Sequence, residues 1–184
     1  MTAPLPFLAS ERLLLRPLCP EDADGAYPRW LNDQEVCAGN AHGLFPYSRD
    51  DARAFIAQAS GPDRLVLAIV LKDGQRHIGN LALQQIHRIY RSAEFAILLG
   101  ERDCHGQGYA AEAGRLLLRH GFQRLNLHRI GCGTFAGNQG MIRLAAALGM
   151  VEEGRRREAA FVAGHHQDIL EFGVLRQEFL HRYP

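Results

Sequence analysis

The chain has 184 residues, of which 21 are basic and 20 acidic, so its formal net charge is +1, and 47% of its residues are hydrophobic. This length predicts a single domain, residues 1–184, with the composition of a soluble globular protein. The balanced charge argues against a nucleic-acid binder, which needs a basic excess, and the lack of a long uncharged apolar run argues against a membrane protein.

The N-terminal third of the sequence predicts one strand and two helices. Residues 12–16 are expected to form the strand, and residues 20–32 a helix that is kinked or split at Pro28. Residues 33–47 show no regular pattern, which suits a mobile segment on the substrate side of the protein. A second helix is expected over residues 49–59, because a serine precedes it as an N-cap.

The middle of the chain predicts three consecutive strands, at residues 65–72, 77–87 and 93–99. The dipeptide Asp73-Gly74 favours a hairpin between the first two. A turn then leads into the third strand, and a helix that reaches about Phe122 follows it. Neighbouring strands of this kind predict an antiparallel run.

The segment Gly106-Gln107-Gly108 separates the third of these strands from the helix. Two glycines at this place let several backbone N–H groups converge on one point, and the positive end of the helix dipole lies behind them. Such an arrangement binds phosphate, so it indicates a phosphate-bearing cofactor. A Gly-x-Gly alone is usually ordinary loop chemistry, and its weight depends on the surrounding sequence.

The C-terminal part predicts a strand at residues 128–135, a helix at 139–148 with Asn138 as its N-cap, a closing hairpin at 150–175 and a short helical tail at 176–183. Together with the preceding elements, this order predicts a mixed α+β fold. Its central sheet is mostly antiparallel and contains a parallel pair.

The four cysteines are scattered and include no CxxC pair. We therefore expect reduced thiols in a cytoplasmic protein rather than disulfides or zinc ligands. The nine histidines are dispersed as well, and even the adjacent His165 and His166 have no second ligand cluster nearby in the sequence, so we expect no metal site.

Several motifs, taken together in their order and spacing, resemble the GNAT superfamily of acetyl-coenzyme A-dependent N-acetyltransferases. Within it, the branch of the ribosomal-protein alanine and serine acetyltransferases is the most similar. The matching segments are Leu14-Leu15-Arg16-Pro17-Leu18, Trp30-Leu31-Asn32-Asp33, Ile78-Gly79-Asn80-Leu81, Ala93–Gly100, Gly106–Ala113, Leu127-His128-Arg129-Ile130, Asn138 with Ile142-Arg143-Leu144, Leu148-Gly149-Met150, Glu153-Gly154, Gln167-Asp168 and Gly173–Phe179. The resemblance implies a GNAT-like fold, in which the parallel strand pair is splayed and helices flank the sheet.

The resemblance also implies the ligands and the residues that hold them. Acetyl-coenzyme A would be the co-substrate, and the acceptor a primary amine on a protein N-terminus or a small molecule such as an amino sugar or a polyamine. The residues implied in cofactor binding are Leu98 and Leu99 beside the pantetheine arm, the loop Gly106, Gln107, Gly108, Tyr109 and Ala110 at the pyrophosphate, and Asn138 and Arg143. A homodimer is one expected assembly, although the sequence does not fix the oligomeric state.

The chain departs from the family pattern in five places. Asp103, His105 and Gln107 replace residues that are usually Gln or Arg, Trp, and Lys or Arg, so one charge that would face the phosphates is absent. Met150 replaces a common Phe. Ala145 stands where many relatives carry a Tyr that protonates the leaving thiolate, which leaves the general acid open.

The chemistry implied is direct attack of the amine on the acetyl thioester. Glu94, an acid at the start of an otherwise apolar strand, is the candidate base; the alternative is a strand-end glutamate that faces water. A covalent route through Cys132 with His128 is less favoured, because buried free cysteines mostly act as small apolar residues. A coenzyme A-binding module without catalysis, suggested by Ala145, remains the alternative function.

Overall fold

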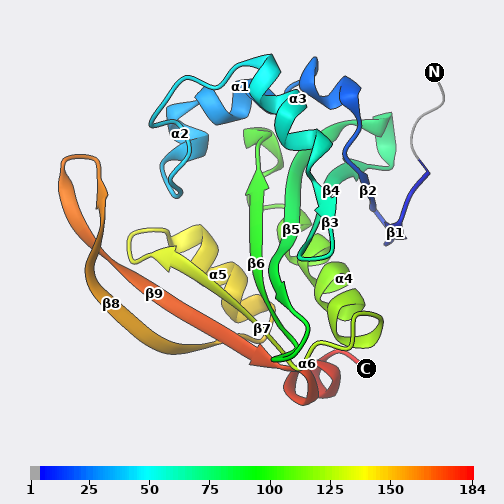
Figure 1. Cartoon of the computed structure of the whole chain (residues 1–184), viewed down its shortest axis with the longest axis vertical. Coiled ribbons are helices and arrows are strands. Elements are labelled where there is room, and N and C mark those ends of the chain that lie inside the picture. Colours follow the sequence, from blue (N-terminus) through cyan, green and yellow to red (C-terminus); the bar gives the residue numbers. More distant parts are fainter. Residues whose placement is uncertain (1–4) are drawn as a thin grey trace.

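A computed structural model describes residues 5–184, which form a nine-stranded sheet, six α-helices and three 3₁₀ turns (Figure 1). The strands are β1 (Leu8–Ala9), β2 (Leu13–Pro17), β3 (Ser60–Gly61), β4 (Arg64–Leu71), β5 (His77–His87), β6 (Ser92–Leu99), β7 (Arg129–Phe135), β8 (Val151–Val162) and β9 (His165–Leu175). The helices are α1 (Tyr27–Asn32), α2 (Gln34–Cys37), α3 (Arg49–Ala57), α4 (Tyr109–Gln123), α5 (Gln139–Ala147) and α6 (Arg176–Arg182), with 3₁₀ turns η1 (Pro20–Ala23), η2 (Asp73–Gln75) and η3 (Arg102–Cys104).

The sheet has the order β1-β2-β4-β5-β6-β7-β9-β8, with β3 attached to β4. Every neighbouring pair is antiparallel except β6 and β7, which run parallel. The expected mixed sheet with one parallel pair is therefore confirmed.

The parallel pair is short. β6 and β7 are paired from Ser92 to Glu94 on one strand and from Arg129 to Gly131 on the other. Beyond Glu94, β6 continues to Leu99 beside β5 alone, and Figure 1 shows β6 and β7 diverging. The β6 edge that faces β7 is therefore free of strand partners over its last five residues, so its backbone can accept hydrogen bonds from a ligand.

Alternate residues of β6 face different layers, as the period of a strand requires. Phe95 is 1% exposed and packs into the main core with Leu117 and Phe122 of α4. Leu98 faces the other side and packs against the cluster around Trp30 on α1. Strand β6 thus stands between the α4 layer and the layer of α1 and α3.

The segment from Pro20 to Asn32 differs from the sequence expectation. The break lies between η1 and α1, ahead of Pro28, which sits in the first turn of α1. A proline costs nothing there, because the first helical N–H groups have no intrahelical acceptor. The irregular segment also contains the one-turn helix α2, which forms because the Asp33 carboxylate accepts hydrogen bonds from the amides of Glu35 and Val36.

Two glycines on α4 let this helix approach its neighbours. A Cβ atom at Gly114 would lie 2.9 Å from the Leu148 side chain, and one at Gly121 would lie 2.9 Å from Leu83. The close packing fixes α4, and with it the loop at its N-terminus, against the sheet.

Candidate active site

The loop from Gly106 to Gly108 has the geometry expected for binding phosphate. Both glycines are left-handed, with φ of 75° and 81°, and no atom lies within 4 Å of a Cβ placed at Gly106. The Glu112 amide donates to the Gly108 carbonyl as the first intrahelical bond, so the amides ahead of it have no acceptor within the helix. The N-terminal end of the 15-residue helix α4 adds a positive dipole. The loop thus fits an anionic group such as the coenzyme A pyrophosphate.

Leu98 and Leu99 lie at the end of the free β6 edge, directly before this loop. The Leu99 carbonyl is 2.8 Å from His105 Nε2. A pantetheine amide that used the Leu99 carbonyl would therefore share it with the imidazole. The side chain of Gln107 turns back to donate to the Asp103 carbonyl, so it does not extend into the loop opening.

Asn138 joins two segments that are distant in the sequence. Its Oδ1 accepts a hydrogen bond of 3.0 Å from the Met141 amide, and its Nδ2 donates over 2.8 Å to the Gly39 carbonyl. The expected N-cap role is confirmed, while any side-chain contact to the cofactor would compete with the Gly39 bond. Arg143 is exposed on α5 and forms no ion pair with any residue from 5 to 184, so it is available to an anion.

A cavity of about 270 Å³ lies where β6 and β7 separate, and Glu94 is one of its lining residues. Glycines leave its floor without side chains: Gly131 pairs with Glu94 on β6 and with Gly173 on β9, and Gly133 pairs with Glu171. The open floor gives a ligand access to the backbone and to the carboxylates around it.

Three of the residues that line this cavity are glutamates, and they differ in their partners. Glu153 forms an ion pair with Arg129, and Glu171 accepts from Arg156 Nε at 2.7 Å. Glu94 is half-buried and accepts from Gln85 Nε2 at 2.8 Å, and it has no cationic partner among residues 5–184. Among these three glutamates, Glu94 is thus the one whose charge no cationic side chain of residues 5–184 offsets.

Cys132 lies on β7 with its thiol buried 3.5 Å from the Met150 sulfur. Burial, together with the charges of Glu94 and Glu171, raises the pKa of the Cys132 thiol to about 12. His128 is exposed and precedes β7. A thiolate nucleophile is therefore disfavoured, and the structure gives no support to the covalent route.

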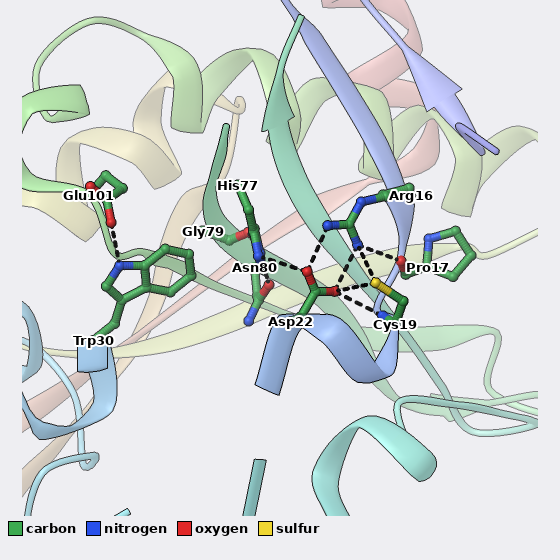
Figure 2. A network of polar contacts seen from close by, with 9 residues as sticks. All are labelled: Arg16, Pro17, Cys19, Asp22, Trp30, His77, Gly79, Asn80 and Glu101. Carbon is green, nitrogen blue, oxygen red and sulfur yellow. Dashed lines mark hydrogen bonds and ion pairs between the residues drawn. The ribbon is translucent and has the colours of Figure 1, made fainter. Parts of the chain in front are cut away.

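A buried polar network holds the N-terminal segment on the sheet (Figure 2). Arg16 donates two hydrogen bonds of 2.7 Å to the Asp22 carboxylate, and His77 Nδ1 lies 3.2 Å from the same group. Burial disfavours the charged carboxylate, but the hydrogen bonds from Arg16 and His77 outweigh it and hold the pKa of Asp22 well below its usual range. This network ties η1 to β2 and β5.

Trp30 connects that segment to the phosphate-binding loop, as Figure 2 also shows. Its Nε1 donates over 2.8 Å to Glu101, the residue immediately before η3, and its ring stands edge-on to His77 at 4.9 Å. A Cβ at Gly100 would come within 2.0 Å of the indole. Helix α1 is therefore fixed against the base of the loop that leads into α4.

Ala145 occupies the position at which the family resemblance implies a tyrosine acid. It is fully buried in α5 and carries no group that could donate a proton. Tyr47 packs against Tyr27 with ring centroids 6.1 Å apart, and burial raises the pKa of the Tyr47 phenol. Tyr109 lies under the Arg12 guanidinium, 4.5 Å from ring centroid to Cζ. Neither tyrosine lines the cavity around Glu94.

Sequence reasoning missed the residues that reach the site from distant segments. Arg12, Gly39 and Glu101 contact site elements through long-range hydrogen bonds, and Glu171 reaches the cavity through the pairing of β9 with β7. One local signal was present: Gly100, directly after a strand, indicates that another group packs closely there, and the structure shows that this group is the Trp30 indole.

Comparisons with known proteins agree with the resemblance to the GNAT superfamily. The family model "Acetyltransferase (GNAT) domain" matches residues 12–151. The spermidine N(1)-acetyltransferase of Vibrio cholerae is 31% identical over 138 residues, which cover 74% of this chain and 79% of that protein. The Bacillus subtilis protein YdaF, named provisionally as a ribosomal N-acetyltransferase, is 27% identical over 55% of each chain.

Solved structures extend the match to the fold. The spermidine N-acetyltransferase from Vibrio cholerae, crystallised with CoA and spermine, has a TM-score of 0.83 and 26% identity, covering 93% of this chain and 99% of that one. None of the helices within residues 5–184 has the length and apolar character needed to span a bilayer. The chain belongs to the GNAT acetyltransferase family and is an N-acetyltransferase that uses acetyl-coenzyme A as its co-substrate.

Proposed function

We propose that the acceptor is the primary amine of a small polycationic molecule and that Glu94 accepts its proton. The observation that carries this proposal is the Glu94 carboxylate, which has no cationic partner within residues 5–184 and lies beside a glycine floor in a cavity with two further glutamates. The name of the Vibrio cholerae relative, a spermidine acetyltransferase, supports the same class of acceptor.

Each part of the chain has a separate task in this reaction. The backbone amides from Gly106 to Ala110 hold the pyrophosphate, and the free edge at Leu98 and Leu99 orients the pantetheine arm, with Arg143 at an outer phosphate. Bound acetyl-coenzyme A supplies an activated thioester carbonyl. The amine attacks that carbonyl, the carbon–sulfur bond breaks, and the acetyl group passes directly to nitrogen.

The need for a base follows from the acceptor. Deprotonation at pH 7 costs about 1 kcal/mol for an α-amino group but about 4–5 kcal/mol for an alkyl amine near pKa 10.4. Glu94 takes this proton, and the amine nitrogen becomes nucleophilic. The partly compensated carboxylates of Glu153 and Glu171 attract the other ammonium groups of the acceptor.

Water supplies the proton that the leaving thiolate needs. Ala145 offers only a methyl group and is fully buried. The coenzyme A thiol is comparable to the cysteine reference near pKa 8.5, so its thiolate leaves without strong acid catalysis. We therefore assign no side chain as the general acid.

A panel of amines, read by release of free thiol, tests the proposal. Spermidine and spermine should give a higher kcat/KM than an amino sugar or a peptide with a free N-terminus. A preference for the peptide would overturn the polycationic acceptor and favour a protein N-terminus. Coenzyme A binding without turnover of any amine would favour the non-catalytic alternative.

We further propose that the whole chain is one catalytic domain, which is supported by the single sheet that runs from β1 to β8. The cytoplasmic location and the homodimer stay predictions. Size-exclusion chromatography with light scattering tests the second of these.

A further inference from the structure

Arg12, just before β2, forms a dense set of contacts with the start of α4, although about a hundred residues separate them. Its Nε donates to Glu112 Oε2 at 2.7 Å, and its Nη2 lies 2.6 Å from the same oxygen. Its Nη1 donates over 3.1 Å to the Gln107 carbonyl in the phosphate-binding loop. The guanidinium thus contacts both the loop and the first helical turn.

Glu112 presents an electrostatic difficulty at this place. It lies in the first turn of α4, where its full negative charge would repel the phosphates that the loop amides attract. Burial disfavours the charged form, but hydrogen bonds from Ser10 and Arg12 outweigh it and lower the pKa of Glu112, so the carboxylate is ionised at neutral pH. A positive charge must therefore offset it if the loop is to bind an anion well.

Arg12 also brings a positive charge close to the loop, where the side chain at position 107 is a neutral glutamine. Its Nη2 lies 3.6 Å from a Cβ placed at Gly108, and its side chain remains 45% exposed over the ring of Tyr109. A guanidinium has five donors, and the contacts to Glu112 and Gln107 leave some of them unused.

We propose that Arg12 and Glu112 form a charge-compensating pair that sets the affinity of the loop for the cofactor phosphates. Arg12 is a positioning residue: it neutralises the Glu112 carboxylate and holds the Gln107 carbonyl, so that the amides of the loop face an anion without a competing negative charge. This role concerns the cofactor alone and holds whichever amine is the acceptor.

Calorimetric titration of coenzyme A into Arg12→Gln, Glu112→Gln and the double variant tests this pair. Arg12→Gln should weaken binding roughly ten-fold, because it leaves Glu112 uncompensated beside the phosphates. Glu112→Gln should bind as tightly as wild type or more tightly, because it leaves Arg12 as a free cation. The double variant should lie between the single variants, near wild type. Arg53→Gln, which breaks the exposed ion pairs of Arg53 with Asp24 and Asp50, is the matched control and should not change binding.

A second measurement separates charge from folding. Acetyl-pantetheine lacks the phosphates, so its turnover by Arg12→Gln should equal that by wild type, while the KM for acetyl-coenzyme A rises about as much as the dissociation constant. Arg12→Lys keeps the charge and should recover most of the affinity.

Two results would overturn the pair's electrostatic role. Equal weakening by both single variants, with no recovery in the double variant, would mean that the contact is only a structural brace. An equal loss of activity with acetyl-pantetheine would mean the same. Neither result would bear on the amine panel, which tests the acceptor.

Discussion

The two ends of β6 build different kinds of site. At its C-terminal end the strand runs into the Gly106–Gly108 loop, where backbone amides and one helix dipole form the proposed phosphate site. At its N-terminal end Glu94 faces a cavity whose lining comes from five strands, β5 to β9. The first end uses mainly the backbone of one contiguous stretch of chain, with Arg12 beside it, and the second uses side chains from several strands.

From this difference we expect substitutions to change the acceptor more readily than the cofactor. Substitutions change a backbone site little as long as they keep the chain conformation and the charges beside it. Substitutions around the cavity change its charge and shape directly, because glutamates border it and glycines form its floor. The two matched proteins carry names that point to different acceptors, spermidine in one case and a ribosomal target in the other.

Glu94→Gln should have the largest effect. It should lower kcat through the cavity end of β6 and leave the cofactor end unchanged. Loss of a general base typically lowers kcat by about 10²–10⁴-fold, while coenzyme A affinity should stay unchanged. The loss should shrink at high pH, where the amine deprotonates unaided. Single-turnover rates between pH 6 and 10 measure this effect, and Glu158→Gln, exposed on β8 outside the cavity, is the control. Equal rates at pH 7 would remove Glu94 from the reaction.

Asp22→Asn should destabilise the layer that carries α1. Removing one partner of a buried ion pair costs about 3–5 kcal/mol. Because folding depresses the Asp22 pKa, its stabilising contribution is present above the unfolded pKa of about 3.9 and is lost as the pH falls. Urea unfolding should therefore show a large gap between variant and wild type at pH 7 and a smaller gap at pH 3. A gap that does not depend on pH would contradict the assignment of charge to Asp22.

Gly108→Asp should abolish coenzyme A binding at the cofactor end of β6 and leave the cavity end unchanged. A carboxylate there occupies the place of the phosphate, and Gly108 has a φ of 81° that a side chain tolerates poorly. A ligand at a hundred times its dissociation constant adds about 2.7 kcal/mol of stability, and the variant should lose this gain. Thermal melts with and without coenzyme A measure it. Gly74→Asp, a left-handed glycine in the η2 turn, should keep the gain.

Gly133→Ala should have the smallest effect, a several-fold rise in the amine KM. A Cβ at Gly133 would lie 3.2 Å from Glu171 Oε2, so the flexible carboxylate must move while the backbone stays. Gly154→Ala on β8 is the matched control, because nothing lies within 4 Å of its Cβ. Initial rates against amine concentration decide the outcome, and an unchanged KM would place the acceptor elsewhere.

The fold and the glycine loop ahead of α4 could be predicted because their signals are local. Strand periodicity, the Asp73-Gly74 turn and the N-cap at Asn138 each depend on neighbouring residues. The break ahead of Pro28 was misplaced, because a proline inside a helical pattern reads the same whether it splits the helix or begins one.

The surroundings of the site could not be predicted in the same way. Arg12 meets Glu112, and Trp30 meets Glu101, only after the sheet has assembled. Glu171 likewise reaches the floor of the cavity through the pairing of β7 with β9. Such contacts follow from the register of the strands, which a single sequence does not specify.

The hydrogen bond between Asn138 and Gly39 closes the opening between the diverging strands β6 and β7 at its far end. At the near end of this opening, three residue pairs join β6 to β7. At the far end, the segment after α2 is joined to the N-cap of α5 by the neutral hydrogen bond from Asn138 to Gly39. One such bond contributes about 0.5–1.5 kcal/mol, far less than a run of paired strand. The link at Gly39 is therefore the weaker of the two, and the shape of the opening depends more on the paired strands than on the segment after α2.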